Sequence, residues 1–222
     1  MRKLEIIATS VQDAINAQEG GATSVEVIQA PEVGGLTPPP DLVGAIRDKV
    51  RIFVRVIVRP QAKSFDYTAE EIETMLQDIH SLRQIGVNGV VFGALDETGA
   101  INLDLTTRIA RAVHPLELTF HRAIDESSDA ETALPTLKGV AQRILTSGHA
   151  ENVFDGRMQI KKWIEQYGKD FTFACGGGIR LPDLAEIVRV TGGSEIHIGT
   201  AARKNGVVDS ATVRQIFEWI NA

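Results

Sequence analysis

Short runs of β-branched and other apolar residues alternate with longer segments of helical period along the whole chain. The strand-like runs are Leu4–Ala8, Ser24–Gln29, Ile52–Arg59, Gly89–Leu95, Glu117–Ile124, Arg143–Ser147, Phe171–Cys175 and Glu195–Gly199. Each is followed by a predicted helix, namely Asp13–Gln18, Asp41–Lys49, Ile72–Ile85, Leu105–Val113, Asp129–Leu137, Arg157–Tyr167, Leu184–Val190 and Ala211–Ile220. Strands that alternate with helices of this length predict βαβ units and a parallel sheet.

Eight such units in 222 residues predict an α/β protein with one domain, residues 1–222, folded as a (β/α)₈ TIM barrel. Barrels of this kind usually have roughly 250 residues, and about 200 is the short end. The alternative is an open doubly wound sheet, which has fewer units and a glycine-rich turn after its first strand. This chain has Thr9-Ser10-Val11-Gln12 at that point, which favours the barrel.

Charged side chains occupy the side of the strands that should face the barrel axis. The side packed on helices must be apolar, so the alternate positions point inward. These inward positions hold Glu5, Glu26, Glu195, Arg55, Arg59, Arg143, His121 and His197. Because an isolated buried charge costs several kcal/mol, we expect the six carboxylates and guanidinium groups to pair or to face a wet cavity.

Position along the strand divides these residues into two groups. An ion-pair network at the bottom of the barrel is expected from those early or midway in their strands, which are Glu5, Arg55, Arg143 and Glu195. Barrel enzymes carry out catalysis at the carboxyl ends of the strands. The inward residues expected at that end are Arg59, His121, Ser147 and His197.

Glycine-rich segments follow the seventh and eighth predicted strands. They are Gly176-Gly177-Gly178 and Gly199-Thr200. Glycine lets backbone N–H groups approach an anion closely, and the loops after strands seven and eight bind phosphate in many barrels. The two segments together predict a site for an anionic group of a small molecule.

Composition excludes several classes of partner and site. The chain has 23 Lys and Arg against 29 Asp and Glu with no basic block, so nucleic acid is not expected as a partner. A single cysteine, Cys175, allows no intramolecular disulfide, multi-cysteine zinc site or iron–sulfur cluster, and fits a cytoplasmic protein. The apolar stretch near the N-terminus is too short for a signal peptide, and no run reaches the roughly 18 residues that cross a bilayer. We therefore expect no membrane partner.

A series of ordered motifs resembles the CutC family, which is named for copper homeostasis. They run from the first strand to the last: Gly20-Gly21-Ala22, Gly34-Gly35-Leu36-Thr37-Pro38, Arg59-Pro60, Gly89-Val90-Val91-Phe92-Gly93, Thr119-Phe120-His121-Arg122-Ala123, Asp125, Arg143-Ile144-Leu145-Thr146-Ser147-Gly148 and Gly176-Gly177-Gly178. The resemblance implies a (β/α)₈ barrel, a role in copper homeostasis and copper as the metal to consider.

The resemblance also directs attention to two missing cysteines. Family members commonly have a cysteine in the first strand and another in the second, where this chain has Ile7 and Ile28. Cu(I) prefers thiolate and thioether ligands, and Cys175 is expected to face the helices. We therefore predict no metal ligand in this chain and name no cofactor from its residues.

Two alternatives to a copper-homeostasis role stay open: a non-catalytic scaffold barrel, and an enzyme doing acid–base chemistry on a small anionic, for example phosphorylated, metabolite. For the enzyme, the expected catalytic residues are Glu26, Arg59, His121, Arg122 and Asp125. The expected binding residues are Glu5, Ser147, Gly177, Gly178, His197, Gly199 and Thr200. The two arginines would complement negative charge, and His121 with Asp125 or Glu26 would move a proton. We also expect a homo-oligomer, either a dimer or a tetramer.

Overall fold

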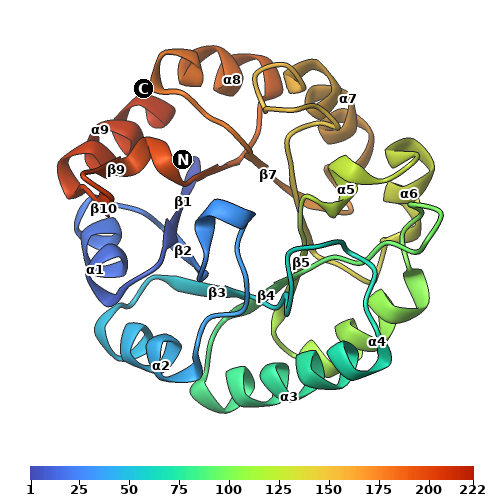
Figure 1. The fold of residues 1–222 in the computed structure, drawn as a ribbon. Coiled ribbons are helices and arrows are strands. Elements are labelled where there is room, and N and C mark those ends of the chain that lie inside the picture. The colour runs from blue at the N-terminus through green and yellow to red at the C-terminus, as the bar shows by residue number, and fades with distance from the viewer.

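Eight parallel strands close into a barrel in the order in which they occur along the chain (Figure 1). The computed structural model describes residues 1–222. The strands are β1 (Lys3–Ala8), β2 (Ser24–Val27), β3 (Phe53–Ile57), β4 (Gly89–Phe92), β5 (Glu117–Phe120), β6 (Arg143–Thr146), β7 (Thr172–Gly176) and β8 (Glu195–Ile198). The predicted TIM barrel is therefore confirmed.

A ring of helices surrounds the barrel (Figure 1). They are α1 (Val11–Glu19), α2 (Pro40–Lys49), α3 (Ala69–Ile85), α4 (Leu103–Val113), α6 (Ala130–Thr136), α7 (Arg157–Tyr167), α8 (Leu184–Thr191) and α9 (Ser210–Asn221). Sequence signals set the ends of α3, because Thr68 and Glu71 form a capping box and Gly86 closes the helix at a φ of 80°. No helix has the length and apolar character that crossing a membrane requires.

The predicted and observed elements agree apart from terminal residues, with one correction at β5. This strand ends at Phe120, and Ile124, which the apolar run placed in the strand, lies in the short helix α5 (Ala123–Glu126). The apolar pattern continues across the junction because Ile124 is fully buried. Burial alone therefore does not reveal where the chain turns from strand to helix.

The main hydrophobic core lies between the barrel and the helices, and Phe173 and Cys175 of β7 belong to it as expected. A second, much smaller cluster lies inside the barrel and consists of Ile28, Ile57 and Val91, with Ile7 packed against it. Leu145 also faces the cavity, and the other inward side chains include the charged residues predicted from the sequence. The strand phases assigned from the sequence are thus confirmed, and they leave charged side chains along the axis.

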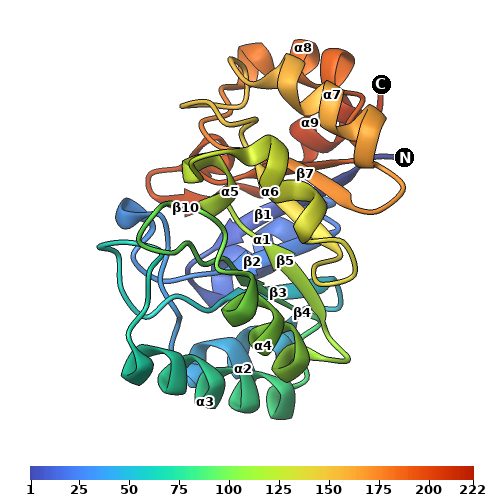
Figure 2. The same cartoon turned by 90° about the vertical axis from the view of Figure 1, so that its right-hand side faces the viewer.

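The loops at the carboxyl ends of the strands gather at one end of the barrel, opposite the chain termini (Figure 2). The loop after β2 contains the short helix η1 (Pro31–Val33) and lies over the centre of the ring in Figure 1. After β8 come η3 (Thr200–Ala202) and a hairpin of β9 (Arg203–Lys204) and β10 (Val207–Val208). Arg203 fastens this hairpin by donating to the carbonyl of Ile7 at 3.0 Å.

Candidate active site

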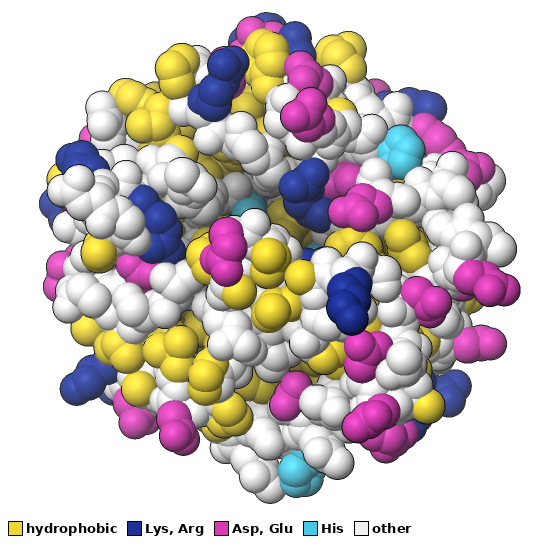
Figure 3. Space-filling view, in the orientation of Figure 1, with side chains coloured by type: hydrophobic (Ala, Val, Ile, Leu, Met, Phe, Trp, Pro, Cys, Tyr) yellow, Lys and Arg dark blue, Asp and Glu magenta, His cyan; other side chains and the backbone are white.

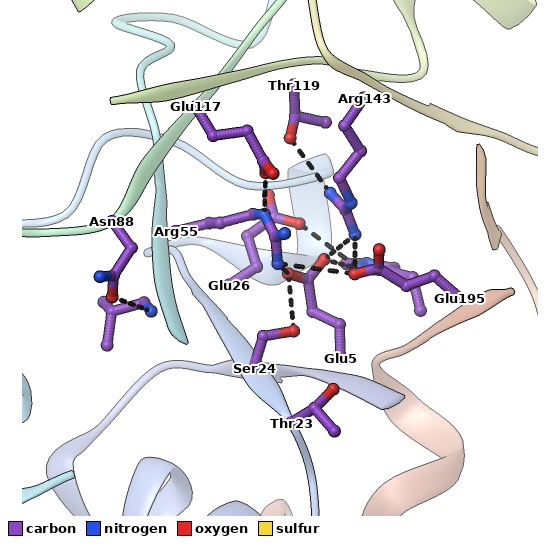
Figure 4. Close-up of polar contacts among 12 residues, drawn as sticks. Glu5, Thr23, Ser24, Glu26, Arg55, Asn88, Glu117, Thr119, Arg143 and Glu195 are labelled. Atoms are coloured by element: carbon purple, nitrogen blue, oxygen red, sulfur yellow. Dashed lines mark hydrogen bonds and ion pairs between the residues drawn. The ribbon is translucent and has the colours of Figure 1, made fainter. Parts of the chain in front are cut away.

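A network of buried ion pairs lies inside the barrel, on the side away from the carboxyl ends of the strands (Figure 4). Glu5 is at its centre: Oε2 accepts from Arg55 Nη1 at 2.6 Å, and Oε1 accepts from Arg143 Nη2 at 2.5 Å. Arg143 Nη2 also donates to Glu195 Oε1 at 3.0 Å. The expected structural network is therefore present, with each guanidinium shared between carboxylates as buried charge requires.

The network contains one residue beyond the expected set. Glu117 takes part by accepting from Arg55 Nε at 2.7 Å. It lies four residues before His121 and has the same phase in β5, so the alternation that placed His121 inward also places Glu117 inward. Arg59 follows the end of β3 and lines the cavity above the network, in keeping with its late position in the predicted strand.

Two glutamates in the interior have opposite pKa shifts. Burial would raise the pKa of Glu5, but Arg143 and Arg55 more than offset this effect and hold the pKa well below 4.5. Burial raises the pKa of Glu26, which no arginine contacts directly. Its Oε2 atom is buried without a hydrogen-bond partner, and His197 Nδ1 lies 3.6 Å away. Glu26 is thus a carboxyl group that can hold or release a proton.

Above the network, a cavity of about 530 Å³ opens at the carboxyl ends of the strands. Nine of the predicted site residues line it: Glu26, Arg59, His121, Arg122, Gly177, Gly178, His197, Gly199 and Thr200. The surface view looks into this end of the barrel and shows a hollow near the axis with Lys and Arg side chains beside it (Figure 3). The cavity is large enough for a small metabolite.

The protonation state of His121 follows from its contacts. Its Nδ1 accepts from the backbone N–H of Ala123 at 3.2 Å, so the proton of the neutral ring is on Nε2. Burial lowers the pKa of His121 to about 3, with a further contribution from Arg59. Nε2 is buried and has no partner in the protein. His121 is therefore a neutral N–H donor at the cavity wall rather than a base near neutral pH.

Backbone amides are free at the glycine segments. The N–H groups of Gly177, Gly178 and Gly199 donate to no acceptor within the protein. Gly177 and Gly178 have φ angles of +110° and +65°, a region that L side chains rarely adopt. A Cβ at Gly177 would lie 3.0 Å from Arg122 Cζ. The loop therefore requires glycine both for its conformation and for its contact with Arg122.

Three predicted site residues lie behind the cavity wall. Glu5 belongs to the ion-pair network, whereas Asp125 and Ser147 hold Arg122 in place. Asp125 accepts from Arg122 Nε at 3.0 Å and from Ser147 Oγ at 2.9 Å, and it also accepts from Thr146. Because its oxygens are occupied, Asp125 does not form the expected proton-transfer pair with His121. It positions Arg122 instead.

The model of the CutC family matches residues 2–202, which includes every strand of the barrel and every residue lining the cavity. The chain belongs to the CutC family. A copper homeostasis protein cutC homolog from Homo sapiens is 36% identical over 203 residues, covering 91% of this chain and 74% of that protein. A family protein CutC from Histophilus somni is 36% identical over 196 residues, covering 88% of this chain and 81% of that protein.

Solved structures agree with this assignment. The structure described as copper homeostasis protein CutC from Streptococcus agalactiae has a TM-score of 0.83 at 26% identity, covering 90% of this chain and 99% of that chain. Phosphoribosyl anthranilate isomerase from Thermotoga maritima has a TM-score of 0.68 at 16% identity, covering 100% of this chain and 99% of that chain. The second likeness concerns the fold alone.

The sulfur atoms of this CutC protein do not form a Cu(I) site. Ile7 and Ile28, where the family commonly has cysteine, both line the cavity. Cys175 is fully buried in the outer core, and burial raises the pKa of its thiol to about 12. No methionine lines the cavity either. Because Cu(I) prefers soft ligands, the residues present do not fit a thiolate or thioether Cu(I) site.

The possible metal-ligand atoms that do lie close together are carboxylate oxygens and an imidazole nitrogen, not sulfur atoms. Possible ligand atoms of Glu5, Glu26 and His197 lie within 4.8 Å of one another. Both oxygens of Glu5, however, already accept hydrogen bonds from arginines. A metal ion there would compete with two guanidinium groups, so this cluster is better described as the acid–base end of the network than as a metal centre.

Some residues of the cavity wall lie in the loops after β2 and β3, which strand alternation does not address. Phe65 is the clearest case: its ring lies 4.8 Å from the ring of His121 and 4.6 Å from Arg59 Cζ. Lys63 of the same loop also lines the cavity. The only available signal for them was the length of the loop after β3, since long loops at this end of a barrel form active sites.

Proposed function

We propose that this CutC protein acts in copper homeostasis, as the names of its relatives state, through an enzyme-like cavity that binds a small anionic molecule and transfers a proton at Glu26. The observation that carries the proposal is the presence, in one cavity, of free backbone amides and a carboxyl oxygen that has no partner. Binding groups and a proton-transfer group in one enclosed space are typical of catalytic sites.

The glycine segments support anion binding at the β7 and β8 side of the cavity. The unused N–H groups of Gly177, Gly178 and Gly199 are the donors that a phosphate or carboxylate group requires. Arg122 adds positive charge there and is held by Asp125 and Ser147, so little side-chain entropy is lost when it contacts a ligand. We assign an anionic group of the ligand to this side.

Glu26 supports proton transfer. Its raised pKa brings the carboxyl group closer to neutral pH, where the same group can both accept and donate a proton. His197 contacts Glu5 Oε1 at 2.9 Å and lies beside Glu26, so the pair connects the cavity to the charged network below. We assign His121 the role of an N–H donor, because burial lowers its pKa and so disfavours uptake of a proton, and its Nδ1 already accepts from Ala123.

Binding and proton transfer are tested separately. Calorimetric titration with glycerol 3-phosphate, with glycerol as the uncharged control, should give saturable binding to the wild type. It should be lost in Gly178→Ala, whose Cβ would lie 3.0 Å from Asn152 Cβ in a left-handed backbone. Phosphorylated metabolites are then incubated in D₂O, and deuterium incorporation at carbon should disappear in Glu26→Gln. A non-catalytic scaffold would show neither result.

A chelator competition tests the copper part of the proposal. The wild type is titrated with Cu(I) in the presence of a strong Cu(I) chelator, and Cys175→Ala serves as the comparison. We expect no stoichiometric retention of Cu(I) by either protein. Tight retention by the wild type that is lost in Cys175→Ala would contradict the proposal and favour direct copper binding through sulfur.

A further inference from the structure

We infer that the β3 and β5 side of the cavity is a carboxylate-binding subsite, formed by Arg59 Nε–H, His121 Nε2–H and the ring of Phe65. The inference deepens the proposed function and rests on it for the ligand's other anionic group, which lies at the glycine segments. β3 and β7 are four strands apart in the eight-stranded barrel, so Arg59 lies across the barrel from the Gly177 loop, and His121, which follows β5, lies between them. The ligand class is therefore a small molecule with a carboxylate at one end and a second anion at the other.

Arg59 is a buried cation without a carboxylate partner. Only 7% of the residue is exposed, yet Arg59 takes part in none of the protein's ion pairs. Its Nη1 donates to the carbonyl of Val33 at 3.0 Å, and Nη2 donates to that of Ala62 at 3.3 Å. Nε is buried without a partner. Since an uncompensated buried charge is costly, the site is complete only with an anion.

His121 supplies a second N–H of the same kind. The residue is 5% exposed and lines the cavity, and its Nε2–H has no acceptor. The bond from Ala123 N–H to Nδ1 fixes the tautomer, so this donor is present at every pH at which the ring is neutral. Both Arg59 and His121 pack on Phe65, which brings the two unused donors to one aromatic surface.

The chemistry of the subsite matches a carboxylate better than a phosphate. It offers one positive charge and two donor nitrogens without any acceptor, Arg59 Nε and His121 Nε2. Nη1 of Arg59 donates to the carbonyls of Val33 and Gly35, and Nη2 donates to that of Ala62. A carboxylate has one negative charge and two oxygens, so both sides are satisfied. A phosphate monoester dianion would leave one negative charge uncompensated in this buried, partly aromatic site. The neighbouring Tyr67 adds no charge, since burial raises the pKa of its hydroxyl.

The test is an NMR titration of the ¹⁵N-labelled full chain with acetate, with acetamide as the uncharged isostere. We expect acetate, and not acetamide, to shift the Arg59 Nε and His121 Nε2 signals in a saturable way. Acetate affinity should fall by about tenfold or more in Arg59→Met and in His121→Phe, and by less in His121→Gln, which keeps an N–H donor. Arg157→Met is the matched control, because Arg157 lies outside the cavity and pairs with Glu186.

A parallel titration with inorganic phosphate separates this inference from the proposed function. Phosphate should shift the amides of Gly177, Gly178 and Gly199, and Arg59→Met should leave that response unchanged. Acetate shifts confined to the glycine segments, or phosphate saturating the Arg59 and His121 signals, would overturn the carboxylate subsite. Acetate binding at Arg59 without any phosphate response would instead remove the glycine anion site and keep the subsite. If Arg59→Met unfolds, the same titrations of the wild type and of Arg59→Lys, which keeps the charge, test the inference.

Discussion

His197 Nδ1 lies 2.9 Å from Glu5 Oε1. Because His197 also lines the cavity, its side chain joins the cavity to the buried ion-pair network. The same nitrogen is 3.6 Å from the partnerless Oε2 of Glu26. Glu5 keeps its charge because two arginines contact it, whereas Glu26 has none and its pKa rises. Two carboxylates on neighbouring strands therefore have different roles, one structural and one suited to proton transfer.

Removal of Arg143 should destabilise the fold strongly. Arg143→Met leaves Glu5 and Glu195 with one guanidinium less in a fully buried site, and breaking a buried pair typically costs about 3–5 kcal/mol. Urea unfolding at neutral pH measures this loss. The control is Lys162→Met at the exposed pair with Glu131, for which we expect less than about 1 kcal/mol. Equal losses in the two variants would contradict a stabilising network.

Glu5→Gln and Glu26→Gln should change the pH dependence of stability in opposite directions. The pKa of Glu5 is lower in the folded chain, so its contribution is present above about 4.5 and is lost on acidification. The pKa of Glu26 is higher in the folded chain, so its contribution is present below about 4.5 and is lost as the pH rises through the folded pKa. In Glu5→Gln, the free energy of unfolding should therefore fall less steeply on acidification than in the wild type. Glu26→Gln should gain stability relative to the wild type at higher pH. Urea unfolding over a pH series gives both slopes.

The fold was predictable because strand and helix periods follow local chemistry. Inward phases placed Glu5, Glu26 and Arg143 correctly, since each has apolar neighbours in the strand that must face the helices. Position along the strand separated Arg59 from the network below it. Glu117 was overlooked because it is the first residue of β5 and is only partly buried, so its role depends on contact with Arg55 from another strand.

The cavity was less predictable, because its wall depends on loops and on contacts distant in sequence. The place of Asp125 after His121 suggests a proton-transfer residue, but its oxygens face Ser147 and Arg122 instead. Phe65 lies in a loop with no periodic pattern, so only the folded chain reveals its contacts with Arg59 and His121. Which side chains occupy the hydrogen-bonding atoms of a residue depends on the tertiary structure, and the spacing of residues along the sequence does not reveal it.

The imidazole of His121 should not titrate in the physiological range. Its pKa of about 3 predicts constant ring ¹⁵N and ¹H shifts from about pH 8 to about pH 4.5, with the proton on Nε2. In the urea-unfolded chain the same ring should titrate with a pKa of about 6.5. Folded-state stability should accordingly fall as the pH drops below about 6.5, and His121→Gln should remove that part of the slope. A folded-state pKa near about 6.5 would restore His121 as a candidate base.

Gly177→Ala should reduce both stability and phosphate binding. The new Cβ would lie 3.0 Å from Arg122 Cζ and from Ser147 Cβ, in a backbone with a φ of +110°. We expect a loss of about 1–3 kcal/mol and a weaker response to inorganic phosphate. Gly44→Ala is the control, since no atom beyond its own stretch of helix lies within 4 Å of the position that its methyl carbon would take, and it should gain about 0.4–1 kcal/mol. Thermal unfolding with and without phosphate compares the two variants.

Cys175 should be inert in the folded protein. It is fully buried against Thr191, and burial raises the pKa of its thiol to about 12, so almost no thiolate forms near neutral pH. We expect a thiol reagent such as a disulfide dye to label the native chain only at the rate of unfolding, and to label it at once in urea. Cys175→Ala should leave the phosphate and acetate titrations unchanged, because the side chain lies outside the cavity. Rapid stoichiometric labelling of the folded chain would contradict this placement and make sulfur available for Cu(I), which prefers thiolate ligands.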